Sequence, residues 1–220
     1  MTIAENIAAI HENIAKTCAE YECDTSRVHL IAVSKKQDER RIEAALQAGH
    51  RIFGENRVQE AYDHWAHRRG QYDDLELHLI GPLQTNKVKD GVALFDVIQS
   101  VDREKLARKL SEEMAAQGRD LPCFIQVNTG LEEQKSGVIP DAVPEFLDYC
   151  YHDCGLNVTG LMCIPPVDDP PALHFALLQK LARQNNLPEL SMGMSADYEA
   201  AIPLGATYIR VGTGVFGERE

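Results

Sequence analysis

The sequence lacks any long hydrophobic run. No apolar stretch approaches the roughly 20 residues that a membrane-spanning helix needs. The first residues, Met1 to Asn6, contain neither a basic segment nor the apolar core of a secretion signal. We therefore expect a cytoplasmic protein with no membrane partner.

Positive charge is also scarce. The 220 residues include 22 Lys and Arg against 34 Asp and Glu, which gives a formal net charge of −12. Proteins that bind nucleic acids or anionic membranes do so through clustered Lys and Arg. The composition disfavours both partners, but a small anionic ligand can still bind where a few cations converge.

The cysteines form no CxxC pair and have no regular spacing, which favours free, mostly buried thiols. They are Cys18, Cys23, Cys123, Cys150, Cys154 and Cys163. Cys150 and Cys154 flank His152 on an expected helix, but two ligands on one turn do not close a tetrahedral site without a second pair elsewhere. We therefore predict no metal site.

What the sequence does contain is a regular alternation of strand-like and helix-like segments. An amphipathic helix over residues 3–18 comes first, with isoleucines three and four positions apart along one stripe. The expected strands cover residues 28–34, 51–54, 75–80, 94–99, 123–128, 158–164, 189–192 and 207–211. The expected helices or helical turns between them cover residues 38–48, about 57–69, 85–92, 103–117, 140–153, 171–184 and 196–204.

Eight strands that alternate with helices predict a single (β/α)8 TIM barrel over residues 1–220, an α/β fold with an extra N-terminal helix. A doubly wound sheet is the alternative. It normally uses fewer strands and has a GxGxxG sequence after its first strand, which is absent here.

The first strand ends in two adjacent lysines, Lys35 and Lys36. In a barrel, all loops that follow strands meet on one face, where such folds place their chemistry. Successive strand residues point to opposite sides, so only one of the two lysines can face the barrel mouth. Both sides of this strand are apolar, and alternation alone does not decide which lysine it is. A lysine in a partly apolar mouth is a candidate nucleophile.

The loops after the last two strands predict a phosphate site. Residues 191–195 read Ser-Met-Gly-Met-Ser and place the Ser195 hydroxyl at the expected start of a helix, while residues 211–214 read Val-Gly-Thr-Gly and expose backbone N–H groups. Barrels commonly bind phosphate in these two loops. Each feature alone has a simpler explanation, because Ser195 could only cap its helix and the glycines could only form a turn.

A phosphate site opposite a nucleophilic lysine suggests a phosphorylated aldehyde held as a Schiff base. Arg210, one residue before the second loop, can lie beside the ring nitrogen of pyridoxal 5′-phosphate. A guanidinium stays protonated, donates a hydrogen bond and leaves that nitrogen unprotonated, so the ring is a weak electron sink.

Six segments together resemble the pyridoxal phosphate homeostasis protein family, also called the YggS-like or proline synthase co-transcribed family. They are spread over the whole chain in the family's order. The segments are IAVSK (31–35), FGENRVQE (53–60), HLIGPLQTNK (78–87), GLMCIP (160–165), LSMGMS (190–195) and IRVGTGVFG (209–217).

The resemblance implies a single barrel of the alanine racemase N-terminal-domain type that binds pyridoxal phosphate. Lys35 would carry the Schiff base and Arg210 would lie at the ring nitrogen. The other implied cofactor-binding positions are Asn56, Met162, Ser195, Gly212 and Thr213, of which the last three would contact the phosphate. Family members are regarded as carriers or regulators of vitamin B6 without established catalytic turnover. This implies pyridoxal-phosphate-dependent apo-enzymes as recipients, and we expect a monomer.

The chain departs from the family pattern at three positions. Lys36 stands where threonine is common, Arg57 where tyrosine is frequent, and Pro203 falls within the helix expected over residues 196–204. The first departure leaves two adjacent lysines to compete for the aldehyde. We expect Pro203 to shorten its helix without affecting Ser195.

Two other functions stay open. A pyridoxal-phosphate-dependent racemase or decarboxylase would need a second base, which this fold type usually takes from an additional β domain. We expect no such domain after residue 220, so Tyr208 or His78 would have to serve. A Schiff-base aldolase acting on a sugar phosphate is the third possible function.

Lys87 and Lys135 are candidates for a basic rim that admits a phosphorylated ligand, or are simply solvated loop residues.

Overall fold

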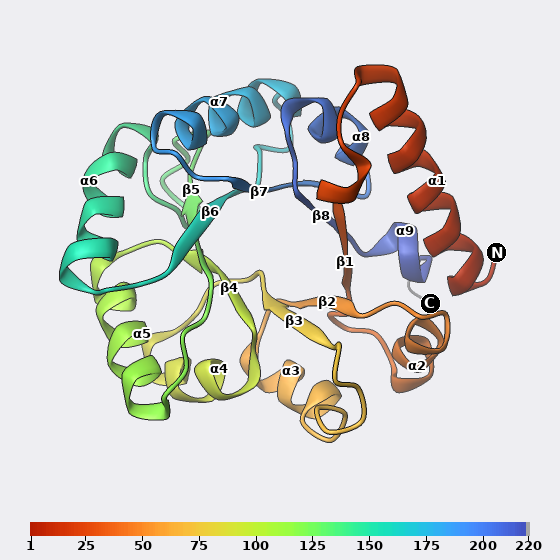
Figure 1. Cartoon of the computed structure of the whole chain (residues 1–220), viewed down its shortest axis with the longest axis horizontal. Coiled ribbons are helices and arrows are strands. Elements are labelled where there is room, and N and C mark those ends of the chain that lie inside the picture. Colours follow the sequence, from red (N-terminus) through yellow and green to blue (C-terminus); the bar gives the residue numbers. More distant parts are fainter. Residues whose placement is uncertain (219–220) are drawn as a thin grey trace.

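A computed structural model describes residues 1–218, in which eight parallel strands close into a barrel in chain order (Figure 1). This confirms the predicted (β/α)8 fold. The strands are β1 (His29–Val33), β2 (Ile52–Glu55), β3 (Glu76–Leu79), β4 (Val97–Val101), β5 (Cys123–Val127), β6 (Val158–Cys163), β7 (Glu189–Met194) and β8 (Tyr208–Val211).

Helices surround the barrel (Figure 1). They are α1 (Ile3–Tyr21), α2 (Glu39–Gln47), α3 (Val58–Trp65), α4 (Val88–Leu94), α5 (Glu104–Gln117), α6 (Val143–Asp148), α7 (Pro171–Gln184), α8 (Tyr198–Ala201) and α9 (Thr213–Phe216). Short helical turns are η1 (Thr25–Arg27), η2 (Thr85–Lys87), η3 (Pro140–Ala142), η4 (Tyr149–Asp153) and η5 (Ile202–Leu204). None of the helices in residues 1–218 is long and apolar enough to cross a membrane.

Helix α1 is the expected extra N-terminal helix. It begins with a capping box, in which Thr2 and Glu5 bond each other's backbone N–H groups. Its buried stripe contains Ile7, Ile10 and Ile14, and it packs against α2 and α9. The Asn6 side chain also donates to the Val215 carbonyl at 2.9 Å, which ties α1 to the C-terminal helix.

Side chains on alternate strand positions divide between two environments. Those that face the helices form one large apolar core, to which β1 contributes Leu30 and Ala32. Inside the barrel, Val97, Phe124 and Met162 form a small separate apolar cluster with Tyr208 packed against it. The remaining interior positions include polar side chains, and these build the site described below.

One predicted strand boundary was wrong, and two of the predicted helices are divided, one of them at Pro203 as expected. Strand β4 begins at Val97 rather than at residue 94, because Leu94 ends α4 and Phe95 packs into the helix-side core. The helix expected over residues 196–204 is α8 followed by η5, since Pro203 lacks the N–H that a continuing helix needs. The segment 140–153 is helical throughout but is divided into η3, α6 and η4.

The six cysteines are free thiols, and all but the half-buried Cys23 are buried, as predicted. Desolvation raises the pKa of Cys150 to about 12, which keeps this thiol protonated and inert. His152 is exposed and lies 3.4 Å from Asp148.

Candidate functional site

A cavity of about 330 Å³ lies at the carboxyl ends of β1, β7 and β8. Six of the seven predicted cofactor-binding residues line it, namely Lys35, Asn56, Ser195, Arg210, Gly212 and Thr213. The other lining residues are Val33, Gln37, Ile80, Ile164, Met194, Ala196 and Gly217. Residues far apart in the sequence therefore converge on one space, on the face where barrels of this class place their chemistry.

The neighbours of Lys35 explain why it faces this cavity. The Ser34 side chain points the other way, where its hydroxyl donates to Glu55 Oε1 at 2.6 Å in the buried layer between the barrel wall and α3. Lys36 adopts a left-handed conformation with φ of 57°, its side chain is exposed, and its backbone N–H donates to the Glu60 carboxylate. Lys35, and not Lys36, is thus the lysine of the cavity, which alternation alone left open.

Arg210 lines the cavity and is 4% exposed. Its Nη1 donates to Ser191 Oγ at 2.6 Å, and its Nη2 donates to the Cys163 carbonyl at 2.7 Å. Burial lowers the pKa of the Arg210 guanidinium, which nevertheless remains a cation. These bonds use two of its five N–H donors and leave three for a ligand.

The two glycine-containing loops meet beside Arg210. The Gly214 N–H donates to Ser195 Oγ at 3.4 Å, which links the loop after β7 to the start of α9. Helix α9 begins at Thr213, and its N-cap Gly212 supplies no capping side chain. Ser195 does not cap a helix, because α8 begins only at Tyr198 after the N-cap Asp197. The Asp197 carboxylate instead accepts from the Met194 N–H at 2.6 Å.

Asn56 offers an acceptor that the protein does not satisfy. Its Oδ1 atom is buried and has no hydrogen-bond partner among residues 1–218. The backbone of Asn56 is packed closely on Gly81, where a Cβ atom would lie 2.3 Å from the Asn56 carbonyl oxygen. The sequence HLIGPL therefore needs glycine at position 81 to hold Asn56 in place.

Met162 does not reach the cavity. It is fully buried in the interior cluster with Val97 and Phe124, and Ile164, two residues further along, lines the cavity instead. From the sequence, both residues belong to the carboxyl end of the same predicted strand. Only the register of the barrel decides which of the two contacts the cavity.

The two alternative bases also lie elsewhere. Tyr208 packs in the barrel interior with its ring 5.2 Å from the ring of His78 and 5.3 Å from that of His29. Burial raises the pKa of Tyr208 well above its ordinary value. Neither Tyr208 nor His78 is among the described residues that line the cavity.

Lys87 and Lys135, the candidates for a basic rim, do not line this cavity in the described part of the chain. Lys135 is 2.5 Å from Glu132 and 3.4 Å from the Pro165 carbonyl. Lys87 lines a neighbouring groove of about 580 Å³ with Arg57, and lies 3.9 Å from Asp90.

Glu55 belongs to the wall of the barrel and not to its mouth. Its fully buried carboxylate accepts at Oε1 from Ser34, from the Trp65 indole at 3.1 Å and from His64 at 2.8 Å. The hydrogen bond between His64 and Glu55 raises the pKa of His64. One ligand-type atom from each of Glu55, Glu60 and His64 lies within 4.8 Å of the others. The protein's own donors bond Glu55 Oε1 and Glu60 Oε1, whereas the buried Glu55 Oε2 has no partner among residues 1–218.

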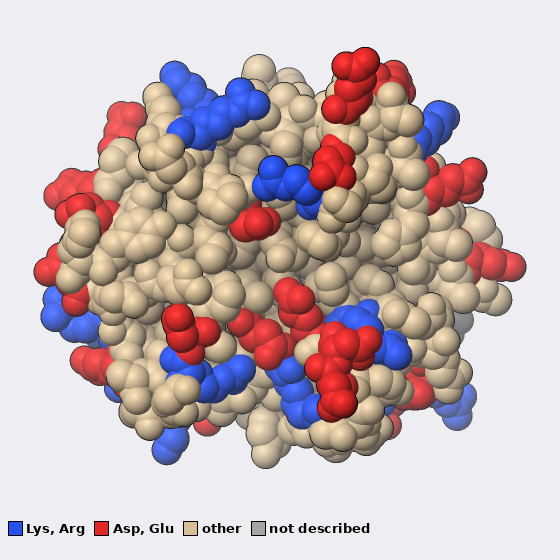
Figure 2. Space-filling view, viewed as in Figure 1, with Lys and Arg blue, Asp and Glu red and all other residues tan. Residues whose placement is uncertain are grey.

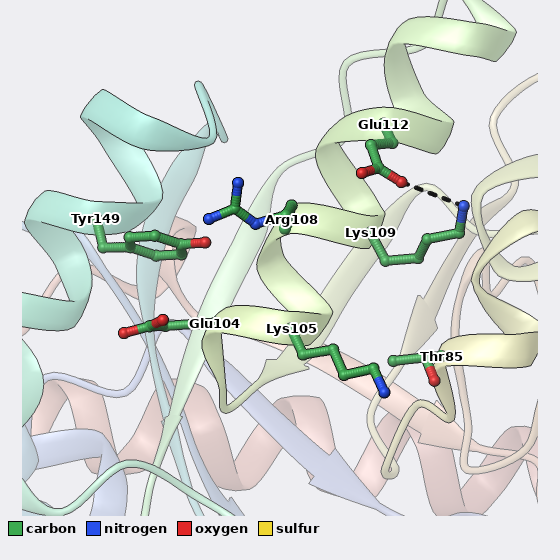
Figure 3. A pocket seen from close by; sticks show the side chains of 7 residues that line it. All are labelled: Thr85, Glu104, Lys105, Arg108, Lys109, Glu112 and Tyr149. Carbon is green, nitrogen blue, oxygen red and sulfur yellow. Dashed lines mark hydrogen bonds and ion pairs between the residues drawn. The ribbon is translucent and has the colours of Figure 1, made fainter.

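Charge on the outer surface is mixed. Figure 2 shows Lys and Arg interspersed with Asp and Glu over the face it presents. A further hollow of about 400 Å³ lies on the outside of α5 (Figure 3). There Lys109 is paired with Glu112 and Glu113, and the Arg108 guanidinium lies 5.7 Å from the centre of the Tyr149 ring. These cations are already engaged within the protein.

Comparison with known proteins defines the class of this barrel. The family model described as "Alanine racemase, N-terminal domain" matches residues 6–220. The solved structure of PipY from Synechococcus elongatus, with pyridoxal phosphate bound, superposes with a TM-score of 0.82 at 35% identity, over 98% of this chain and 100% of that one.

Two curated relatives carry the name pyridoxal phosphate homeostasis protein. The protein from Pseudomonas aeruginosa is 41% identical over 100% of this chain and 96% of its own length. The protein from Vibrio cholerae is 40% identical over 100% of this chain and 97% of its own length. The chain belongs to the pyridoxal phosphate homeostasis protein family, as the resemblance predicted.

Proposed function

We propose that this chain is a cytoplasmic, single-domain pyridoxal-phosphate-binding protein that holds the cofactor as a Schiff base on Lys35. In this role it serves the homeostasis of the cofactor without catalytic turnover. The observation that carries the proposal is the convergence of Lys35, Arg210 and the loops around Ser195 and Gly212 on one cavity. The cofactor-bound PipY structure and the names of the relatives support it.

The residues fit a phosphorylated pyridine aldehyde. When bound, pyridoxal phosphate supplies an aldehyde carbon that can be attacked by an amine. Lys35 provides that amine, and the paired loops at Ser195 and Gly212 provide hydroxyl and backbone donors for an anion. Arg210 provides a permanent donor for the ring nitrogen, and Asn56 Oδ1 provides an acceptor for a hydroxyl donor.

The lining of the cavity argues against turnover. Racemisation and related chemistry at an α-carbon need a group that accepts or delivers a proton on the face opposite the lysine. Among the described lining residues, Lys35 and Arg210 are the charged side chains, and there is no Tyr, His, Cys, Asp or Glu. A cationic Arg210 at the ring nitrogen also keeps that nitrogen unprotonated and weakens the electron sink.

Absorption spectroscopy tests the binding proposal. The purified protein supplied with pyridoxal phosphate should show a visible absorption band that borohydride abolishes. The band should persist in Lys36→Ala, the matched control, and be lost in Lys35→Ala. A protein that stays colourless would contradict the proposal.

Deuterium exchange tests for turnover. Incubation of the loaded protein with a panel of amino acids in D2O should give no α-proton exchange beyond one turnover. Sustained exchange would identify a racemase-like enzyme. Cleavage of a sugar phosphate by a colourless protein would identify an aldolase.

A further inference from the structure

A line of buried hydrogen bonds leads away from Arg210 through the interior of the barrel. Arg210 Nη1 donates to Ser191 Oγ at 2.6 Å, and Ser191 Oγ donates to Gln99 Oε1 at 2.6 Å. Gln99 Nε2 lies 2.8 Å from His78 Nδ1, and His78 Nε2 lies 2.6 Å from Glu76 Oε1. Five side chains are thus joined by four short bonds.

The chemistry of the five groups gives these bonds one direction. A guanidinium only donates, so Ser191 must accept from Arg210 and spend its single proton on the Gln99 carbonyl oxygen. The Gln99 amide then donates, and a neutral His78 must accept at Nδ1. His78 therefore carries its proton on Nε2 and donates to Glu76, whose pKa is lowered chiefly by this hydrogen bond. The line runs from a cation at the cavity to an anion at the other end.

The line crosses the whole barrel. Arg210 and Ser191 lie on the neighbouring strands β8 and β7, and Gln99 and His78 lie on β4 and β3. Strands β4 and β7 are not neighbours in the barrel, so the Ser191–Gln99 bond spans its interior. Ser191, Gln99 and His78 are fully buried. Glu76, at the start of β3, has a side chain that is 38% exposed. The cavity is therefore connected to the opposite end of the barrel.

We propose that Ser191, Gln99 and His78 are positioning residues, which fix the orientation of the Arg210 guanidinium toward the cofactor and couple it to the Glu76 carboxylate. The cofactor part of this inference rests on the proposed function. Ser191 anchors Arg210 directly, because within residues 1–218 the guanidinium has one other hydrogen-bond acceptor, the Cys163 carbonyl. Gln99 and His78 in turn fix the direction in which the Ser191 hydroxyl points.

A purely structural role would predict that these buried groups affect stability alone. Gln99→Glu separates the two explanations, since it keeps the size of the side chain but replaces the amide donor with a second acceptor. The new carboxylate still accepts from Ser191, but His78 can donate to it and to Glu76 at the same time only by taking a second proton. Gln126→Glu is the matched control, because Gln126 is a buried glutamine on β5 that donates to the Ser136 carbonyl and does not belong to the line.

The first readout is ¹⁵N NMR of the histidines in the cofactor-free protein at pH 7, with His78→Gln as the assignment control. We expect neutral His78 with its proton on Nε2, and an imidazolium at His78 in Gln99→Glu but not in Gln126→Glu. A parent His78 with its proton on Nδ1, or no change in Gln99→Glu, would overturn the direction of the line.

The second readout is the binding of pyridoxal phosphate and the position of its visible band. Ser191→Ala removes the anchor of Arg210, and we expect about tenfold weaker binding, as for the loss of one hydrogen bond to a charged group, and a shifted band. Ser191→Thr, which keeps the hydroxyl, should restore both. Ser191→Ala also decides the matter if Gln99→Glu does not fold.

Borohydride labelling keeps this test separate from that of the proposed function. If the parent takes a label on Lys35 while Ser191→Ala retains parental affinity and band position, the positioning role is wrong and the proposed function stands. If the parent takes no label, the proposed function fails, and the NMR measurement still tests the hydrogen-bond line.

Discussion

The Ser34 hydroxyl donates to Glu55 Oε1 at 2.6 Å on the helix side of the barrel wall. This bond fixes which side of β1 faces inward at its carboxyl end. Because alternate residues point to opposite sides, the bond directs Lys35 into the cavity. Which of the two lysines lines the cavity thus depends on a polar contact on the other side of the strand.

Removing the Ser34 hydroxyl should therefore cost stability. Ser34→Ala leaves the fully buried Glu55 carboxylate with one donor fewer. We expect a loss of about 1–2 kcal/mol in the free energy of unfolding, typical of a buried hydrogen bond to a charged group. Urea denaturation measures this, with Ser26→Ala at an exposed serine as the control. Equal costs for the two substitutions would contradict this role of Ser34.

The Glu55–His64 pair should make stability depend on pH. The hydrogen bond to Glu55 raises the pKa of His64 above its ordinary value of 6.5, so the folded chain binds this proton more tightly than the unfolded chain does. The stabilisation is fully present below the unfolded pKa and is lost as pH rises through the folded pKa. Urea midpoints measured upward from pH 5.5 should fall more steeply in the parent than in His64→Gln. His67→Gln, at an exposed histidine, should behave like the parent.

Gly193 should tolerate no side chain. Its φ is +90°, and a Cβ atom there would lie 2.8 Å from Ala201 Cβ and 2.9 Å from Tyr198 Cα. We expect Gly193→Ala to destabilise the fold by about 1–3 kcal/mol. Gly70→Ala is the control, because a Cβ atom at Gly70 meets nothing within 4 Å. Thermal unfolding distinguishes the two variants, and an equal melting temperature would contradict the expected strain.

Ser195 should distinguish phosphorylated from unphosphorylated ligand. Its hydroxyl lies at the junction of the two loops that we assign to the phosphate. We expect Ser195→Ala to weaken the binding of pyridoxal phosphate about tenfold and to leave that of pyridoxal nearly unchanged. Equilibrium titration of both ligands measures this ratio. Equal losses of affinity for the two ligands would show that the phosphate does not bind at this junction.

The strand count, the order of elements and most of the cavity were predictable from the sequence, because each depends on a local pattern. Lys35, Ser195, Arg210 and Gly212 all follow or end strands, and a barrel brings such positions to one face. The start of β4 was mispredicted because an apolar run does not show where a buried helix gives way to a strand.

The interior of the barrel could not be predicted in the same way. Whether Met162 or Ile164 lines the cavity depends on strand register, and the bond between Ser191 and Gln99 joins residues on strands that are not adjacent. No local pattern records such a contact.

The most direct test of the central claim is borohydride reduction of the protein loaded with pyridoxal phosphate, followed by peptide mapping. Lys35 and Lys36 are adjacent, so fragmentation must separate the two positions. We predict a single pyridoxyl label on Lys35. A label on Lys36, or no label on either lysine, would contradict the account.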